Sequence, residues 1–243
     1  MKKLFSAILD YIFPRRCCVC RQCLFSSNYR YLCDQCFGKI IFPSHNLCQK
    51  CGYDFGEASS RGPKLCPRCL EKKFYFQSLR SAVRLNGISR QLILRFKYRN
   101  GEHLAPDLCK IIQQNTDFMD FIADSVLVPV PLHWRRQFFR EYNQSELLAK
   151  TLEKFPIPIQ VLPLLKRIRY TRPQVELHAS ERHDNMRHAF RMNAKIKIPL
   201  DTKLVVFDDV LTTGSTINEC CKVLQKYGFS NINAATFAQT TKD

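Results

Sequence analysis

The later two thirds of the chain alternate between two patterns of apolar and polar residues. Short, largely apolar segments, which are typical of buried strands, lie at 81–85, 126–130, 204–207 and 231–239. Segments with apolar residues three or four positions apart, which are typical of helices, lie at 88–98, 104–114, 136–155 and 216–227. Strands that alternate with helices predict an α/β fold with a parallel sheet over residues 76–243.

The last of these predicted helices has recognisable ends. Thr216 and Glu219 form a Thr-x-x-Glu capping box, which predicts that the helix starts at Thr216. Gly228 stands where a helix commonly stops. The residues predicted to face the core are Ile217, Cys220, Val223, Leu224 and Tyr227.

The part of the chain before residue 76 differs in composition. Ten of the 13 cysteines lie between Cys17 and Cys69. Eight of them form Cys-x-x-Cys pairs: Cys17 with Cys20, Cys33 with Cys36, Cys48 with Cys51, and Cys66 with Cys69. This spacing lets two thiolates hold one metal ion from a tight turn, and two pairs complete the four-thiolate shell of structural Zn²⁺. Residues 1–75 are therefore predicted to form an N-terminal helix and a double zinc ribbon, whose folding energy would come from the metal.

Two alternatives to zinc fit these cysteines less well. A disulfide framework needs an oxidising compartment, and a thioredoxin-like site would have one Cys-x-x-Cys pair in a helical context rather than four pairs. Within the first group, Cys20 with Cys23 is also spaced by two, and Cys18 lies beside the ligands; Cys17 with Cys20 is the preferred pair. The remaining cysteines, which lie in helical patterns and are predicted to fill the core, are Cys109, Cys220 and Cys221.

The N-terminus predicts no export signal. Residues 1–13 contain two lysines, several apolar residues and Asp10, and no small-residue cleavage site follows before the cysteines. This pattern favours a short amphipathic helix over a signal peptide. No stretch of 18 apolar residues exists, so no membrane span is predicted. We expect a cytoplasmic protein.

The chain is strongly basic. It has 38 Lys and Arg against 21 Asp and Glu, which gives a formal charge of +17. Such a charge favours a polyanionic partner, namely nucleic acid, a phosphorylated small molecule or anionic lipid, although a solvated basic surface would explain it too. Residues 166–191 contain seven Lys or Arg, three acids and three histidines. Aromatic residues interleaved with basic ones, which suit single-stranded nucleic acid, are Trp134, Phe138, Phe139, Tyr142 and Tyr170.

The segment from Val205 to Thr216 carries the most specific chemistry. A buried strand is followed by two carboxylates, Asp208 and Asp209, and then by Thr212, Thr213, Gly214, Ser215 and Thr216. A loop that enters a helix N-terminus points free backbone N–H groups at one spot, and threonine and serine hydroxyls add donors, so it predicts an anion site. The carboxylates can accept hydrogen bonds from sugar hydroxyls nearby. An ordinary strand–turn–helix would explain the threonines but not the two adjacent acids.

This segment resembles the phosphoribosyl pyrophosphate (PRPP) motif of type I phosphoribosyltransferases. The whole chain is similar to the ComF family of competence proteins, which join a double zinc ribbon to a phosphoribosyltransferase domain. One departure is Glu141, which stands where the family often has Gly. Further matching segments are 13–17, 96–98, 128–131, 143–144, 171–174 and 187–190.

The resemblance implies a type I phosphoribosyltransferase-like fold that binds PRPP with Mg²⁺. Asp208 and Asp209 would meet the ribose hydroxyls, Thr212 to Thr216 would hold the 5-phosphate, and the loop after Val128–Pro131 would approach the pyrophosphate. A flexible basic lid would close over the pyrophosphate through Lys166, Arg167, Arg169 and Arg172.

The same resemblance implies a part in DNA uptake during natural transformation, with incoming single-stranded DNA as a partner. Two other functions stay open: a metabolic phosphoribosyltransferase that acts on a base or an amine, and a zinc-ribbon adaptor for a partner such as a helicase or another competence protein. Neither the acceptor substrate, nor whether transfer occurs, nor the oligomeric state follows from the residues.

Overall fold

The computed structural model describes residues 15–24, 27–56, 65–98, 100–132, 142–168 and 189–240. The predictions that fall outside these ranges concern the helix at 1–13, Arg169, Arg172, most of the basic segment 166–191, and the aromatic residues Trp134, Phe138, Phe139 and Tyr170. Within the described ranges, no helix is long and apolar enough to cross a membrane.

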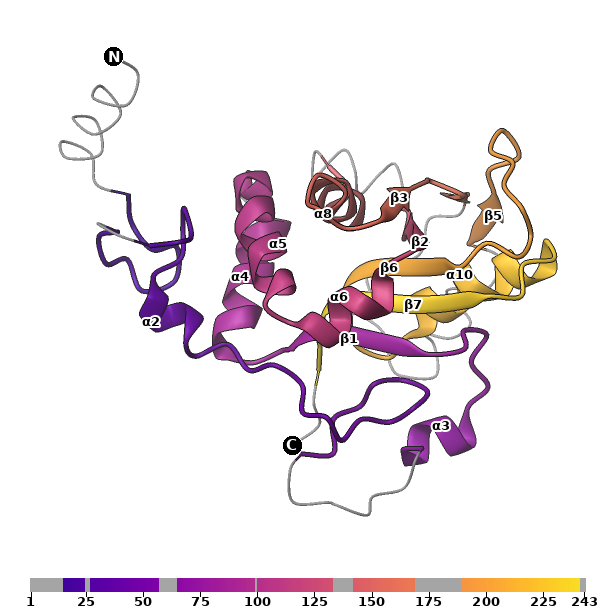
Figure 1. The fold of residues 1–243 in the computed structure, drawn as a ribbon, viewed down its shortest axis with the longest axis horizontal. Coiled ribbons are helices and arrows are strands. Elements are labelled where there is room, and N and C mark those ends of the chain that lie inside the picture. The colour runs from indigo at the N-terminus through magenta and orange to yellow at the C-terminus, as the bar shows by residue number, and fades with distance from the viewer. Residues whose placement is uncertain are drawn as a thin grey trace.

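Five parallel strands form the central sheet (Figure 1). Their order across the sheet is β1 (Leu79–Arg84), β7 (Ile232–Gln239), β6 (Leu204–Leu211), β2 (Ser125–Pro129) and β3 (Ile159–Val161). All residues of β2 and β7 are buried, as expected for inner strands of a parallel sheet. The predicted parallel α/β sheet is confirmed. The short edge strand β3 has no clear signal in the sequence.

Helices cover both faces of this sheet. On one face lie α4 (Gly87–Lys97), the 3₁₀ turn η1 (Gly101–Leu104), α5 (Ala105–Gln113), α6 (Thr116–Ile122) and α8 (Gln144–Leu152). Their apolar side chains pack with Phe207 of β6 and Phe237 of β7. On the other face lie α10 (Ser215–Lys226) and an antiparallel hairpin of β4 (Leu165–Arg167) and β5 (Phe190–Met192).

Two predicted helices begin elsewhere than expected. Within the described residues, the helix predicted at 136–155 begins at Gln144, since Tyr142 and Asn143 are not helical. The predicted capping box of the last helix is wrong: α10 begins at Ser215 with Gly214 as its N-cap, and Thr216 lies inside its first turn. Gly214 has φ +75°, a left-handed conformation that glycine adopts without strain and that starts the helix one residue early.

The buried face of α10 also differs from its prediction by one residue. Tyr227, which was predicted to face the core, is 54% exposed. Tyr227 is the C-cap of the helix, where the chain turns away through Gly228 at φ +97°. The predicted burial of Cys109, Cys220 and Cys221 is confirmed, since all three are inaccessible to solvent.

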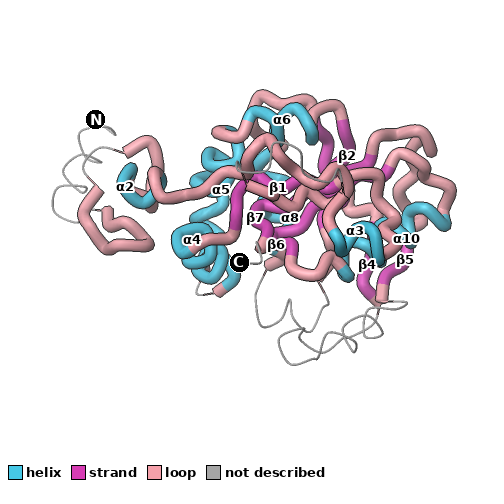
Figure 2. Tube along the Cα trace, turned by 90° about the horizontal axis from the view of Figure 1, so that it is seen from below, coloured by secondary structure: helices cyan, strands magenta, loops and turns pink. Residues whose placement is uncertain are grey.

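The cysteine-rich segment packs on the sheet domain at two places. Short helices α2 (Asp34–Phe37) and α3 (Pro67–Glu71) mark them, and Figure 2 shows α2 far from α3. Near α2, the buried carboxylate of Asp107 on α5 accepts hydrogen bonds from the backbone N–H groups of Arg30 (2.9 Å) and Tyr31 (2.7 Å). Between α2 and α3, the chain pairs with β1, where the Leu79 N–H donates to the Lys50 carbonyl at 2.8 Å.

The first of these contacts predicts a large loss of stability for Asp107→Ala. The substitution leaves two partly buried backbone N–H groups without their acceptor, and an unsatisfied donor costs up to about 1–3 kcal/mol when it is fully buried. Denaturant unfolding of the zinc-loaded protein should show a loss of about 2–4 kcal/mol. Asp117→Ala is the matched control, because that carboxylate is 77% exposed. Equal stability of the two variants would contradict this account of how α5 holds the cysteine-rich segment.

Candidate functional site

The eight paired cysteines gather into two clusters. The first cluster is Cys17, Cys20, Cys33 and Cys36, and the second is Cys48, Cys51, Cys66 and Cys69; in each, all four Sγ atoms lie within 4.8 Å of one another. All 13 cysteines are free thiols rather than disulfides. Four sulfur ligands suit tetrahedral Zn²⁺ and leave no position for water, so both clusters are structural zinc sites rather than catalytic ones.

Backbone N–H groups favour the thiolate form of one cysteine in each cluster, whereas burial raises the pKa of Cys33, Cys36, Cys51 and Cys69. Burial alone would raise the pKa of Cys17, but hydrogen bonds from the backbone of Cys20, Cys33 and Val19 outweigh it and lower the pKa to about 7. The pKa of Cys48 is likewise lowered to about 7 against the effect of burial, by the backbone of Cys51, Cys66 and Lys50. These tight turns thus favour the charged sulfur that a metal needs.

The structure separates the two extra cysteines from the ligands. Cys23 is exposed and outside the first cluster, and its backbone pairs with Arg16. Burial raises the pKa of Cys18 to about 12, with a further contribution from the charge of Cys17, so Cys18 is an uncharged thiol. Cys17 with Cys20 is the pair brought together, as the sequence favoured.

The two carboxylates lie inside β6, the middle strand of the sheet, and not after its end. β6 continues through Asp208 and Asp209 to Leu211, four residues beyond the predicted strand. Asp208 is half-buried and accepts a hydrogen bond from Ser145 Oγ of α8 at 2.7 Å. Asp209 is buried, and its carboxylate lies 2.9 Å from Lys97 Nζ at the end of α4. Partners from two helices therefore stabilise carboxylates that the strand alone would leave without hydration.

Burial raises the pKa of Asp208 from its ordinary 3.8 to about 6. The neighbouring charge of Asp209 raises it further, while Ser145 and Lys97 act in the opposite direction. An acid with this pKa is largely ionised at neutral pH and loses its charge in mildly acidic solution.

Beyond β6, the chain forms a loop of hydroxyl groups at the start of α10. Thr213 Oγ1 and Ser215 Oγ lie 3.0 Å apart, and Gly214 is the N-cap with no side-chain hydrogen bond to the helix. The helix has 12 residues and no acid in its first turn. The first N–H groups of the helix and the nearby hydroxyls are donors of the kind that an anion needs.

The segment that carries and follows the second cysteine cluster contacts this loop and the first turns of α10. Arg68, which lies between Cys66 and Cys69 on α3, donates to the Thr212 carbonyl at 3.1 Å. Asn218 of α10 accepts from the Tyr75 N–H at 2.7 Å and donates to the Lys73 carbonyl at 3.2 Å. Sequence reasoning missed these contacts, since Arg68 and Thr212 are 144 positions apart.

The start of α8 meets the same edge of the sheet. Asn143 Nδ2 donates to the Val130 carbonyl just after β2, at 3.1 Å. Gln144 is 2% exposed, and its Nε2 has no hydrogen-bond partner. Both residues were noted in the sequence only as part of a matching segment. A buried amide without an acceptor costs free energy, which a bound oxygen could recover.

Lys166 and Arg167, the first two residues of the predicted lid, lie in the hairpin strand β4. β4 pairs with β5, where Lys166 is opposite Arg191 and Arg167 is opposite Phe190. The Arg167 guanidinium lies over the Phe190 ring, 5.4 Å from its centroid, while Lys166 is exposed. The two ends of the predicted lid are thus ordered by strand pairing.

The two cysteine clusters predict a zinc content of two ions per chain. The Cys20→Ser variant should bind about one ion, whereas the Cys23→Ser variant should keep both. Cys23 is a matched control because both cysteines are exposed but only Cys20 belongs to a cluster. Elemental analysis measures the content. Strong chelation should expose the backbone of residues 17–70 to hydrogen exchange, because the metal supplies their folding energy. Reduced protein that is purified without zinc would contradict the assignment.

The raised pKa of Asp208 predicts how Asp208→Asn responds to pH. Folded protein binds this proton more tightly than unfolded protein, so Asp208 favours folding below about pH 4, and this contribution is lost as the pH rises through 6. Relative to wild type, Asp208→Asn should therefore gain roughly 1–3 kcal/mol of unfolding free energy between pH 4 and pH 7. Denaturant unfolding across this range tests it, with Asp201→Asn, an exposed acid, as the control that should show no such gain.

Known proteins are similar to the cysteine-rich segment of this chain and, in other cases, to most of its length. Residues 8–72 match the family described as "Double zinc ribbon domain". Competence protein F of Haemophilus influenzae is 28% identical over 218 residues, which are 84% of this chain and 95% of that protein. DNA utilization protein YhgH is 28% identical in Salmonella typhi and 26% identical in Escherichia coli K12, in each case over 93% of this chain and 98% of the relative.

A hypoxanthine phosphoribosyltransferase from Staphylococcus aureus is a structural neighbour, with a TM-score of 0.29 and 11% identity, over 58% of this chain and 76% of that one. The fold class rests on the parallel sheet and the two cysteine clusters themselves. The chain is thus similar over most of its length to competence protein F and the YhgH proteins, and its residues 8–72 match the double zinc ribbon family.

Proposed function

We propose that this protein binds PRPP with Mg²⁺ and takes part in DNA uptake, where it handles single-stranded DNA. Residues 1–75 would be the zinc-ribbon domain and residues 76–243 the PRPP-binding domain. The DNA role is supported by the names of the relatives, a competence protein and DNA utilization proteins. The PRPP site rests on one observation: two carboxylates in the central strand lead, within one short loop, to the uncapped start of α10.

The two ends of ribose 5-phosphate differ in the partners that they need. A phosphate needs donors, which the loop from Thr212 to Thr216 supplies through backbone N–H groups and hydroxyls. Ribose hydroxyls need acceptors, which the carboxylates of Asp208 and Asp209 supply. Lys97 and Ser145 already hold these carboxylates in place, so the sugar would meet acceptors whose positions are set before it binds.

The pyrophosphate end would lie among basic groups. Lys166, Arg167, Arg169 and Arg172 are the proposed contacts, and closure of the segment that follows β4 would exclude water. Mg²⁺ would arrive with PRPP, held chiefly by oxygen atoms of the ligand and by water, as is usual for this ion at phosphates. The unpaired amide of Gln144 is a further donor at the same edge of the sheet.

Asp208→Asn and Asp209→Asn should each weaken PRPP binding by at least about tenfold, because a hydrogen bond to a charged acceptor contributes about 1.5–3 kcal/mol. Calorimetric titration of the zinc-loaded protein with PRPP and Mg²⁺ measures this loss. Asp201→Asn, which removes an exposed acid from the residues before β6, should bind as wild type does. Unchanged binding in both site variants would contradict the PRPP assignment, provided that their zinc content and unfolding transitions match those of wild type.

A further inference from the structure

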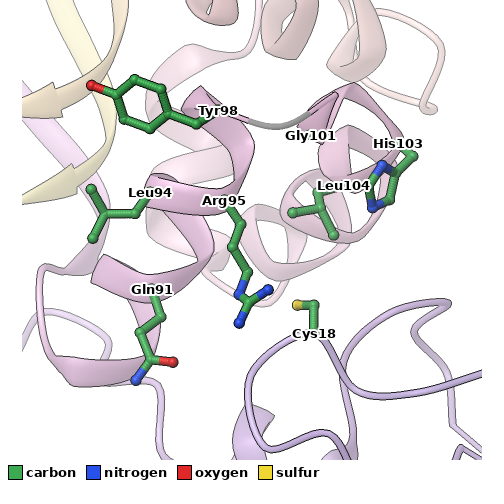
Figure 3. A pocket seen from close by; sticks show the side chains of 8 residues that line it. All are labelled: Cys18, Gln91, Leu94, Arg95, Tyr98, Gly101, His103 and Leu104. Atoms are coloured by element: carbon green, nitrogen blue, oxygen red, sulfur yellow. The ribbon is translucent and has the colours of Figure 1, made fainter.

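A pocket of about 520 Å³ lies between the first cysteine cluster and α4 (Figure 3). Cys18 contributes from the ribbon side, His103 comes from η1, and α4 supplies Gln91, Leu94, Arg95 and Tyr98. Its two walls are held together by the Asp107 hydrogen bonds to the backbone of Arg30 and Tyr31. The pocket therefore exists only where the zinc ribbon and the sheet domain meet.

The electrostatics of this pocket favour an anion. No acid lines it, and α4 contains Arg90, Arg95 and Lys97 but no acid along its length. Figure 3 shows the Arg95 guanidinium directed toward Cys18 across the pocket. Among the described residues, Lys97 pairs with Asp209, while no carboxylate forms an ion pair with Arg95. One cation is thus available where the pocket opens.

Apolar side chains are exposed beside that cation. Leu94 is 48% and Tyr98 is 53% exposed, and in Figure 3 both project from the same side of α4. Their spacing of four residues places them one above the other on the helix surface. On the other side of the pocket, the ring of His103 packs against Tyr31 in a T-shaped pair at 4.5 Å, and the Arg30 guanidinium lies 5.5 Å from the Tyr31 centroid.

His103 and Gln91 add polar groups that can read a ligand. His103 Nδ1 lies 2.8 Å from the Asn100 carbonyl, which only accepts, so Nδ1 carries a proton and Nε2 is left for another partner. Gln91 is exposed and offers both an amide donor and an acceptor. Cation, aromatic ring and amide together are the groups that recognise a nucleotide within a single strand.

We propose that a single strand of DNA crosses α4 at this pocket, with a phosphate at Arg95 and a base stacked on Tyr98 beside Leu94. This inference rests on the proposed DNA role and gives that role a place, distinct from the PRPP loop. The pocket volume suits a nucleotide unit rather than a protein domain. A strand fits better than a free nucleotide, because two further exposed cations, Arg90 on α4 and Arg30 on the ribbon, are available for further phosphates.

The same helix keeps this strand apart from the acids of β6. Lys97 Nζ is bound to Asp209, so the cation nearest the acids is already neutralised and offers little to DNA. Arg95 and Tyr98 can therefore bind a phosphate and a base without breaking the ion pair that orders the PRPP site.

Two substitutions should weaken the binding of a fluorescent oligothymidylate of about 12 nucleotides in different ways. Tyr98→Ala removes a stacking surface, so affinity should fall about tenfold with the salt dependence unchanged. Arg95→Gln removes one phosphate contact, so affinity should fall and the slope of log K against log salt should become less steep by about 0.7. Fluorescence anisotropy at several salt concentrations, with the full-length zinc-loaded protein, measures both quantities.

Matched controls lie at the end of α10. Tyr227 is 54% exposed, almost the same as Tyr98, and Lys226 beside it is exposed. Tyr227→Ala and Lys226→Gln should leave affinity and slope within about twofold of wild type. Equal losses at the two places would overturn the proposal, as would loss of zinc in the Arg95 or Tyr98 variants.

The remaining outcomes separate this inference from the proposed function. If wild-type protein binds the oligonucleotide and the two pocket variants bind as tightly, the pocket is wrong while the DNA role stands. If wild type binds no oligonucleotide at any salt concentration, the DNA role fails as well. Competition by thymidine monophosphate at concentrations similar to those of the oligonucleotide would overturn the assignment to a strand, since a free nucleotide would then be the ligand.

Discussion

The structure depends on keeping two adjacent carboxylates in its central strand. Asp208 and Asp209 lie in β6, between β7 and β2, where burial removes water from both and each charge repels the other. Lys97 neutralises one and Ser145 donates to the other, so α4 must end and α8 must begin at this edge of the sheet. The Tyr142 hydroxyl, which donates to the Phe96 carbonyl, joins these two helix ends. An arrangement that is costly without a ligand is typical of a site that binds one.

The zinc ribbon extends this arrangement to the loop that follows. Arg68 reaches the Thr212 carbonyl from between two cysteines of the second cluster, and Asn218 joins the first turns of α10 to the backbone at Lys73 and Tyr75. The loop before α10 is therefore supported by a segment whose own folding depends on metal. A structural zinc ion that does not itself touch the bound anion can influence an anion site in this way, because it fixes the backbone that supports the N–H groups at the start of α10. The segment around the first cluster has a different neighbour, α5, and its Cys18 lines the pocket on α4.

Local chemistry in the sequence was enough to predict the main elements of this molecule. The Cys-x-x-Cys spacing predicts the sulfur pairs, although Cys20 with Cys23 has the same spacing as Cys17 with Cys20, and apolar runs such as 204–207 locate the inner strands. The predictions that were incomplete concern residues whose structure depends on partners far away in the sequence. β6 was predicted to stop before Asp208 since acids are rare in buried strands, and the groups that make them tolerable, Ser145 and Lys97, lie in other helices. The strand pairing of Lys166 and Arg167 was missed for the same reason.

Net charge predicts less than the pairing of individual charges. Two cations of α4, two positions apart, have different fates: Lys97 is neutralised by Asp209, whereas Arg95 lines the pocket and forms no ion pair with an acid among the described residues. A formal charge of +17 counts both alike. Only a cation without an acid partner can release counterions from a polyanion, so the available positive charge lies on the outer side of α4 rather than at the acids. On the two proposals made above, α4 would separate two kinds of anion recognition, a cradle at the start of α10 and an open surface for a longer strand, and the Lys97–Asp209 pair would keep the two apart.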